Sequence, residues 1–456
     1  MIGILVASVA FVVWFWRRRL LSITCVGAYT TLFLLMNYAG VVFAFFGLDP
    51  LLIGFQYSQA DAWRAIILLH LGIACVWLGV LYTDHFLYRD RPVRWSSFFS
   101  YPGILVGMSA LRILVLFAFS AGVFFVLFLP IFPRFMYVAL HGDIVAKMNY
   151  RHNVTTQGSY TSALTVLAYD ILPYLSLSLL VISWRTGALR TVSLITVAIS
   201  CVALFYGLLK QPLVGFALLL AIASNWAWAW RRRAVAIRVA RNVKRRVPRR
   251  GPLVGFSLAA ALLLGLYYWT IGTNQTGSFG QRMELTAGMV VSRVLFRSSD
   301  GYIYVASLMP TKMPFVGLTN ISTIQWLVGG SFHNINDEIF ARANIGGPQG
   351  TISLDSLCNY YAQFGWLGLV IGAFLQGLGL ALLDRYILSR PRDLGLMVLA
   401  LFVMKSASYL NGTHVFGAVL GYGGLYSVGL YLILKRKPAA RYGEVPQMQA
   451  DMRSAT

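Results

Sequence analysis

The chain has 456 residues, of which 58% are hydrophobic and 12% are charged, whereas about 25% of the residues of an average soluble protein are charged. This composition excludes a soluble protein of several domains with polar surfaces and favours a chain with many membrane spans. The net charge of +23 does not indicate a nucleic-acid partner, because most lysines and arginines lie in short clusters just outside apolar runs, as in the cytoplasmic loops of membrane proteins.

Long apolar runs recur along the whole chain. A run of about 20 residues crosses the bilayer as a helix, because only a helix satisfies its own backbone hydrogen bonds there. We therefore predict an all-α protein, a polytopic bundle of about eleven transmembrane helices with a helical extracytoplasmic cap. The predicted spans, in chain order, are residues 2–16, 20–46, 65–83, 103–129, 163–183, 191–209, 212–230, 253–272, 364–383, 395–410 and 414–434.

The loops between the spans differ in charge on the two sides. Lysines and arginines are concentrated in every second loop, above all in the loop 231–252, and the positive-inside rule places that set in the cytoplasm. Two long polar loops, 130–162 and 273–363, then face outward. The chain accordingly divides into residues 1–272 with the earlier spans, a large outer loop at 273–363 that we predict to be catalytic, the last spans at 364–434 and a cytoplasmic tail at 435–456.

Signatures of cofactor binding are missing from the sequence. Of the four cysteines, Cys25, Cys75 and Cys201 lie inside apolar runs and Cys358 lies alone in the large outer loop, so neither a disulfide framework nor a metal site is predicted. No Walker A, dinucleotide-binding or zincin motif occurs. We therefore expect a protein that uses no metal and no nucleotide cofactor.

The first half of the large outer loop predicts a helix over 280–308 that carries three arginines. Arg282, Arg293 and Arg297 fall within about 60° of one another at 3.6 residues per turn. Like charges on one helix face repel, so the stripe is better explained if it faces an anion, and arginine binds phosphate through a planar, bidentate fork. The alternative is an ordinary surface helix in which neighbouring carboxylates offset the charge.

Two lysines extend this predicted anion site. Lys210 lies in a tight outer turn, and Lys405 lies inside the tenth predicted span, where an ionisable side chain is costly and indicates a cavity or a substrate path. Lys210 can instead extend to the membrane interface. Arg112 and Asp170 also lie within predicted spans. They could form a structural ion pair with one another, and no chemistry is assigned to them.

The second half of the large outer loop holds a cluster of possible proton acceptors, His333, Asp337 and Glu338. A sugar hydroxyl that attacks a carbon atom needs a base within hydrogen-bond reach. His333 and Asp337 lie four residues apart and can share one helix face. His333 and Glu338 are the candidates for the catalytic base, and the alternative is a capped or solvated helix end.

Aromatic side chains mark the end of the loop, in the set Asn359, Tyr360, Tyr361, Phe364 and Trp366. Rings at the edge of a span usually form an interfacial belt, and they equally suit stacking against sugar rings. The remaining candidates for substrate binding are Asp337, Tyr304, Asn359 and Tyr360. Glycines follow at a spacing that allows close helix packing, namely Gly365, Gly368 and Gly372.

In this layout the chain resembles the bacterial O-antigen and oligosaccharide repeat-unit polymerases, the Wzy-type integral membrane glycosyltransferases. The resemblance rests on about a dozen spans and on a large, late outer loop with an arginine-bearing helix. It also rests on two short motifs, the turn Lys210-Gln211-Pro212 and the return into the membrane through Asn359-Tyr360-Tyr361 and Phe364-Gly365-Trp366.

The resemblance implies an enzyme of the bacterial inner (cytoplasmic) membrane whose active site faces the periplasm. Such enzymes transfer a glycan from undecaprenyl diphosphate to the non-reducing end of another lipid-linked repeat unit and release undecaprenyl diphosphate. The implied partners are undecaprenyl-diphosphate-linked glycans, membrane lipids, a chain-length regulator and a flippase. The leaving group is a diphosphate, so Arg293 and Arg297 are predicted to bind it, with Arg282, Lys210 and Lys405 around them.

Three other functions stay open at this point. An O-antigen ligase shares the donor chemistry and attaches the glycan to lipid A-core, although the histidine-containing outer-loop motif expected of a ligase is not found in its usual form. A flippase or another transporter would concentrate polar groups at the midplane in repeated halves, and no convincing internal repeat is seen. An assembly protein of the cell envelope would need no arginine stripe.

Overall fold

The computed structural model describes residues 24–46, 57–88, 109–142, 146–147, 149–150, 163–208, 212–213, 215–217, 219–220, 223–224, 265, 268, 278–295, 300–321, 324–325, 328–331, 333–343, 354–389, 394–413, 415 and 424–434. Within these residues every regular element is a helix, and no strand occurs. The predicted all-α fold class is therefore confirmed for this part of the chain.

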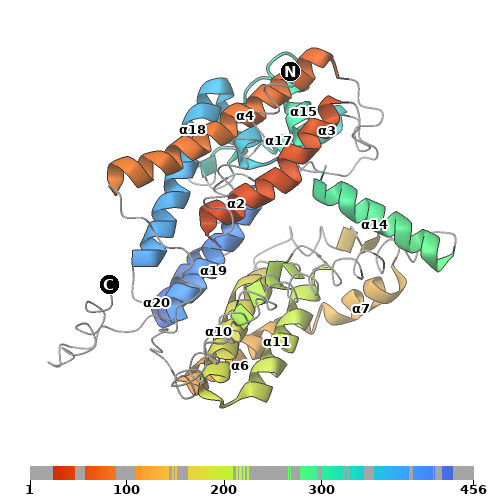
Figure 1. Cartoon of the computed structure of the whole chain (residues 1–456). Helices are drawn as coiled ribbons and strands as arrows, with labels where there is room; N and C mark the ends of the chain where they lie inside the picture. The colour runs from red at the N-terminus through yellow and green to blue at the C-terminus, as the bar shows by residue number, and fades with distance from the viewer. Residues whose placement is uncertain are drawn as a thin grey trace.

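Figure 1 shows how the helices follow one another. In chain order they are α2 (Cys25–Phe33), the π-helix η2 (Leu34–Tyr38), α3 (Ala39–Phe45), α4 (Gln59–Tyr82), the π-helix η4 (Thr83–Leu87), α6 (Ala110–Phe128), α7 (Phe132–His141), the π-helix η5 (Leu167–Ile171), α10 (Leu172–Thr186), α11 (Arg190–Phe205), α14 (Phe279–Leu295), α15 (Asp300–Leu308), the 3₁₀ turn η7 (Gly317–Asn320), α17 (Ile335–Ala343), α18 (Ser356–Ser389), α19 (Leu394–Tyr409) and α20 (Gly424–Leu434). The predicted helix over 280–308 is thus described as two helices, α14 and α15, and residues 296–299 lie outside the described part.

Several helices are long and apolar enough to cross a membrane. Five such segments are found, at Cys25–Phe45, Gln59–Leu87, Ala110–Phe128, Ala163–Trp184 and Ser356–Ile387. Shorter apolar helices occupy Arg190–Phe205 and Leu394–Ala407, and they overlap the predicted spans 191–209 and 395–410. The chain therefore has the helices expected of a membrane protein. The total of about eleven spans stays a prediction, since span 2–16 lies outside the described residues and spans 212–230 and 253–272 lie largely outside them.

Glycines allow α4 and α18 to pack against each other very closely. A Cβ atom at Gly79 of α4 would lie 2.2 Å from the backbone oxygen of Phe374, and one at Gly377 of α18 would lie 1.9 Å from the backbone oxygen of Val76. No larger side chain fits at either position. Close backbone approach through small residues is a common way in which helices associate in membranes.

Hydrogen bonds at the helix ends join α18 to α2 and to α19. The carboxylate of Asp384, near the end of α18, accepts bonds from the backbone N–H groups of Cys25 (2.8 Å) and Val26 (3.1 Å) at the start of α2. At the other end, the N–H of Ser356 donates to the backbone oxygen of Leu410 (2.8 Å), just after α19. The start of α2 therefore lies beside the end of α18, and the end of α19 lies beside the start of α18.

Each of the three π-helical segments in the described residues carries a polar side chain that bonds to another part of the bundle. The pairs are Asn37 with Asp355, Asp84 with Arg385 and Asp170 with Lys405. A π-helical turn inserts an extra residue into an α-helix and changes the direction of the side chains near it. The polar contacts between helices thus coincide with local departures from α-helical geometry.

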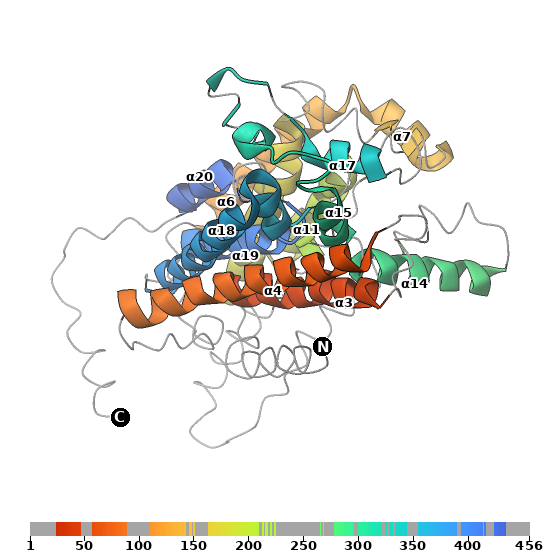
Figure 2. The same ribbon diagram turned by 90° about the horizontal axis from the view of Figure 1, so that it is seen from above.

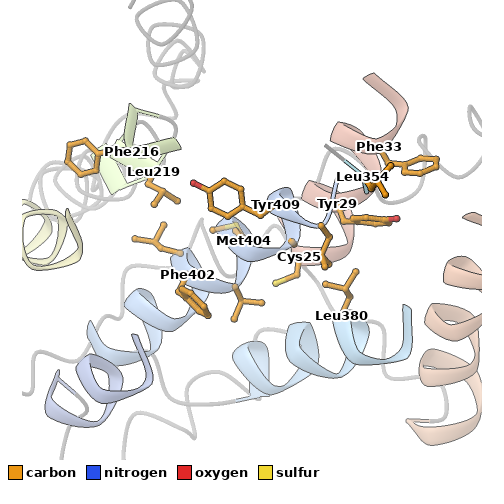
Figure 3. Close-up of a cluster of buried hydrophobic side chains, with 14 of the residues drawn as sticks. Cys25, Tyr29, Phe33, Phe216, Leu219, Leu354, Leu380, Phe402, Met404 and Tyr409 are labelled. Atoms are coloured by element: carbon orange, nitrogen blue, oxygen red, sulfur yellow. The ribbon is translucent and has the colours of Figure 1, made fainter. Parts of the chain in front are cut away.

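The helices fall into two groups with α19 and α20 between them (Figures 1 and 2). One group contains α6, α7, α10 and α11, and the other contains α2, α3, α4, α15, α17 and α18. Helix α10 contacts α19, and η5 contacts α20. Figure 3 shows the apolar part of this junction, where α19 places Met404 and Tyr409 between Phe216 and Leu219 on one side and Cys25 and Leu380 on the other.

Candidate functional site

The first part of α18 is a short half-helix that folds back along the rest of the same helix. The backbone leaves helical geometry at Phe364 (φ −136°, ψ 17°) and Gly365 (φ 65°, ψ −150°). Beyond this turn a Cβ atom at Gly372 would lie 2.6 Å from Cγ of Tyr360, and the Tyr360 hydroxyl donates to Oε1 of Gln376 at 3.0 Å. In one straight helix Tyr360 and Gln376 would be about 24 Å apart. The predicted return of the chain at 364–366 is therefore a sharp turn between two helices.

Asp355 caps the half-helix and joins it to two other helices, η2 and α15. Its carboxylate accepts hydrogen bonds from the backbone N–H of Cys358 (2.8 Å), from the side-chain amide of Asn37 in η2 (3.1 Å) and from the hydroxyl of Tyr302 in α15. The same amide donates to Oδ1 of Asn411, just after α19 (3.3 Å). Burial raises the pKa of Asp355 to about 6, although the bonds from Cys358 and Tyr302 act in the opposite direction. This carboxylate thus joins α15, which lies in the loop predicted to face outward, to the apolar helices.

A second set of hydrogen bonds joins the half-helix to the loop before α17. The amide of Asn320 donates to Oδ1 of Asn359 (3.1 Å), and the N–H of Ile335 donates to Oδ1 of Asn320 (3.3 Å). The N–H of His333 donates to the backbone oxygen of Thr319 (3.0 Å). His333 is therefore held in place relative to α18 by a continuous chain of hydrogen bonds.

His333, Glu338 and Arg342 form an accessible polar cluster. Nε2 of His333 lies 2.5 Å from Oε2 of Glu338, while Nε and Nη2 of Arg342 both donate to Oε1 of Glu338 (3.0 and 2.7 Å). A third guanidinium nitrogen, Nη1, donates to the backbone oxygen of Lys312 (3.0 Å). The side chains of His333 and Arg342 are 45% and 46% exposed. A carboxylate at Nε2 fixes the imidazole and leaves Nδ1 as the nitrogen that can accept a proton.

Asp337 does not share a helix face with His333, so this expectation is wrong. Helix α17 begins at Ile335, which leaves His333 before the helix, and the carboxylate of Asp337 accepts a hydrogen bond from the Asn334 amide (2.6 Å). The physical reason is Asn334, whose Oδ1 accepts the N–H of Asn336 (3.2 Å). An asparagine that bonds its own backbone two residues on favours a helix start. Substrate binding by Asp337 stays a prediction.

Lys405 pairs with Asp170. Its Nζ lies 2.9 Å from Oδ1 of Asp170 and donates to the backbone oxygen of Tyr169 (3.2 Å). The expected pair between Asp170 and Arg112 is therefore wrong, because Lys405 reaches Asp170 from α19, whereas Arg112 is exposed in the first turn of α6. Asp170 already balances the charge of Lys405, so Lys405 is not included in the proposed anion site. The binding of a diphosphate by Lys405 stays a prediction from the sequence.

Two of the three predicted anion-binding arginines belong to α14. Arg282 and Arg293 are separated by eleven residues of α-helix, which places them on the same face but about 16 Å apart along the axis. Their binding of a diphosphate stays a prediction. Arg297 and Lys210 lie outside the described residues, and their roles stay predictions.

Three predicted substrate-binding side chains contribute to the packing of the site. Tyr304 and Asn359 are each only 1% exposed, and the ring of Tyr360 lies against Gly372, beyond the turn in α18. Such buried side chains offer a substrate little surface in this conformation. We therefore give them a positioning role, and direct contact with a substrate stays a prediction.

Exposed aromatic rings surround the turn at Gly365. Phe315 meets Tyr361 edge-on with ring centres 5.6 Å apart, and Tyr361 meets Trp366 in the same way at 4.9 Å. The side chains of Phe315, Phe364 and Trp366 are 39%, 50% and 40% exposed. Rings in such a position suit stacking against sugars or anchoring at the membrane interface.

Sequence reasoning missed Asp355, Tyr302 and Arg342. Asp355 carried a usable signal, because an aspartate directly before an apolar helix is a typical N-cap. Arg342 also carried one, because it follows Glu338 by four residues, the spacing of a helical ion pair. The bond of Tyr302 to Asp355 joins residues 53 positions apart, and no local pattern predicts it.

Comparison with protein family models, with curated proteins and with solved structures finds no match to this chain. Its function is therefore inferred from the sequence layout and from the geometry of the site.

Proposed function

We propose that the protein is a polysaccharide polymerase of the bacterial inner membrane, which joins polyisoprenyl-diphosphate-linked repeat units on the outer face of that membrane. The observation that carries the proposal is the accessible imidazole of His333, which Glu338 and Arg342 orient. Hydrogen bonds through Thr319 and Asn320 hold this group beside the half-helix of α18. A fixed proton acceptor next to apolar helices suits the activation of a hydroxyl group on a lipid-linked sugar.

The proposed reaction is a displacement at the anomeric carbon of the donor. A hydroxyl oxygen of the acceptor sugar forms the new bond to this carbon, while the bond between the carbon and the diphosphate oxygen breaks and its electron pair leaves with the diphosphate. The hydroxyl proton moves to Nδ1 of His333, the general base. Glu338 stabilises the positive charge that the ring gains, and Arg342 holds Glu338 in position.

This assignment chooses between the two bases that the sequence left open. Both carboxylate oxygens of Glu338 are already bonded, Oε2 to His333 and Oε1 to Arg342. The imidazole is the more exposed group and keeps one nitrogen for a substrate. His333 is therefore the proposed base, and Glu338 is a positioning residue.

The departing diphosphate is proposed to meet the arginines of α14 and of the segment that follows it. Negative charge develops on the leaving oxygen as the glycosidic bond breaks, and arginine donors that are already in place lower the barrier. Arg293, at the end of α14, and Arg297 are the proposed ligands, with Arg282 further along the substrate. A diphosphate is an activated leaving group, so the proposed reaction consumes no nucleotide. The substrate would reach the protein from a flippase, and a chain-length regulator would set the polymer length.

The test is polymer synthesis by the full-length protein in liposomes that contain lipid-linked repeat units. His333→Gln should lower the rate by roughly 100-fold or more, and Glu338→Gln should cause a smaller loss because the base remains. Glu284→Gln is the matched control, since Glu284 is an exposed residue of α14 outside the site. Polymer made at the wild-type rate by His333→Gln would overturn the proposal. Wild-type protein that moves the glycan across the bilayer and forms no polymer would identify a transporter instead.

A further inference from the structure

Helix α7, in the shorter outer loop, has two apolar faces. One face packs inside the protein through Phe135, Val138 and Ala139, and the Phe135 ring lies 5.5 Å from that of Phe128 in α6 and 6.1 Å from that of Phe205 in α11. The other face exposes large apolar side chains, namely Phe132 (43%), Met136 (36%), Tyr137 (69%) and Leu140 (65%). An amphipathic helix on a water-facing loop would carry polar side chains on that second face.

The polar side chains of α7 occupy a narrow sector between the two apolar faces. At about 100° per residue around the helix axis, counted from Phe132, the exposed apolar residues lie at about 0–140° and the buried residues at about 240–340°. Arg134 and His141 fall between these sectors and are exposed. The only polar edge of the described helix therefore carries basic residues.

The exposed apolar face of α7 continues the outer surface of α6. Helix α6 ends at Phe128 and α7 begins at Phe132, and α6 is one of the segments long and apolar enough to cross a membrane. Its own exposed side chains are Leu111, Val115, Phe119, Phe125 and Val126, and Leu129 follows directly after the helix. From Val115 onward this strip would face lipid in a membrane span, and it passes through the turn onto α7 without a charged residue.

We propose that α7 is an interfacial helix that lies in the membrane surface at the end of α6, with phospholipid as its partner. Its exposed apolar face enters the region between headgroups and acyl chains, to a depth of about 5–10 Å in such helices. Arg134 and His141 then lie at the level of the lipid phosphates, where basic side chains are favourable. Figure 2 shows α7 at the margin of the molecule, where a bilayer can reach it. This inference is independent of the proposed enzymatic reaction.

Quenching of a fluorescent amino acid tests the position of each face. The full-length protein receives this amino acid at position 137 or 140 on the exposed apolar face, or at position 134 on the polar edge as the matched control. All three sites are exposed, so folding should be preserved, and the elution of each variant in detergent checks it. In nanodiscs made with brominated lipids, positions 137 and 140 should lose roughly half of their fluorescence, as expected for burial at the interface, and position 134 should lose much less.

Two results would overturn the proposal. If iodide in the water quenches positions 137 and 140 while brominated lipid does not, this face of α7 lies in water. If neither quencher reaches them in the nanodisc, another segment of the chain or a second copy of the protein covers the face. Quenching by lipid at positions 137 and 140, with iodide favouring position 134, supports the interfacial helix.

Discussion

The Nζ atom of Lys405 lies 2.9 Å from Oδ1 of Asp170, and this ion pair joins α19 to the group of helices that contains α10. Both side chains are almost buried, and the rings of Tyr174 and Tyr409 have their centres 5.9 and 5.8 Å from Nζ. Taking two charges out of water is costly, and the attraction within a pair roughly offsets that cost. The free energy of unfolding should therefore fall most when only one of the two partners is removed.

Removal of Lys405 alone should therefore destabilise the protein more than removal of the whole pair. Lys405→Met leaves the Asp170 carboxylate buried without this partner, at a cost of about 3–5 kcal/mol in the free energy of unfolding. The double variant Lys405→Met with Asp170→Leu should recover most of that loss. Urea unfolding in detergent micelles measures both. Equal losses in the single and double variants would contradict an energetic coupling between the two residues.

The turn within α18 should depend on the absence of a side chain at position 365. Gly365 has φ 65° and ψ −150°, a region that residues other than glycine occupy at a cost of about 1–3 kcal/mol. A Cβ atom there would also lie 3.0 Å from Cζ of Phe315. Gly365→Ala should lower the melting temperature and the polymer yield, because the turn positions the half-helix.

Gly379 provides the matched control in the same helix. It lies in the regular part of α18, and a Cβ atom at this position would meet nothing within 4 Å. Gly379→Ala should be neutral, or should stabilise the helix by about 0.5–1 kcal/mol. Similar melting temperatures for the two variants would show that the turn at position 365 does not need a glycine.

Asp355 should make stability depend on pH in a definite direction. Burial raises its pKa from 3.8 to about 6 in the folded protein, so the folded state binds the proton more tightly than the unfolded state between these values. The free energy of unfolding should then fall as pH rises from about 4 to about 6, by at most about 3 kcal/mol from this residue.

Asp355→Asn removes this titration and isolates the effect. The melting temperature of the variant minus that of the wild type should increase as pH rises through this window. Above about pH 7 this difference should stay constant. Other titrating groups cancel in the difference. A difference that does not change between about pH 4 and about pH 7 would mean that Asp355 titrates in the same way in both states.

The sequence predicted those parts of the fold that depend on local patterns. Apolar runs indicated the helices at Cys25–Phe45 and Ala163–Trp184, because burial in a membrane requires about 20 consecutive apolar residues. The entry of the chain into a span at 364–366 was expected from the aromatic residues there and from the resemblance, whereas the reversal of direction at Gly365 was not predicted. The packing of the two parts of α18 was not predictable from local patterns, because the hydrogen bond between Tyr360 and Gln376 joins residues on opposite sides of the turn.

The polar contacts were less accessible to sequence reasoning. Asp170 and Lys405 lie 235 positions apart, and Asp170 belongs to a π-helical turn that a periodicity of 3.6 residues does not anticipate. The cluster around Glu338 was predicted in part. His333 and Glu338 were identified and Arg342 was not, and the helix start at Ile335 means that Glu338 rather than Asp337 faces His333.

The predicted orientation in the membrane can be tested with two exposed alanines. Ala341 lies in α17, within the loop predicted to face outward, and Ala188 lies in the turn between α10 and α11, next to Arg190 and predicted to be cytoplasmic. An impermeant maleimide added to intact spheroplasts should label Ala341→Cys at once and Ala188→Cys only after permeabilisation, because the positive-inside rule retains the arginine-flanked turn in the cytoplasm. The wild-type protein gives the background, since Cys25, Cys75 and Cys358 are buried and Cys201 is partly so. Labelling in the reverse order would place His333 on the cytoplasmic side and contradict polymerisation on the outer face. Equal labelling of both variants in intact spheroplasts would contradict the predicted alternation of the helices across the membrane.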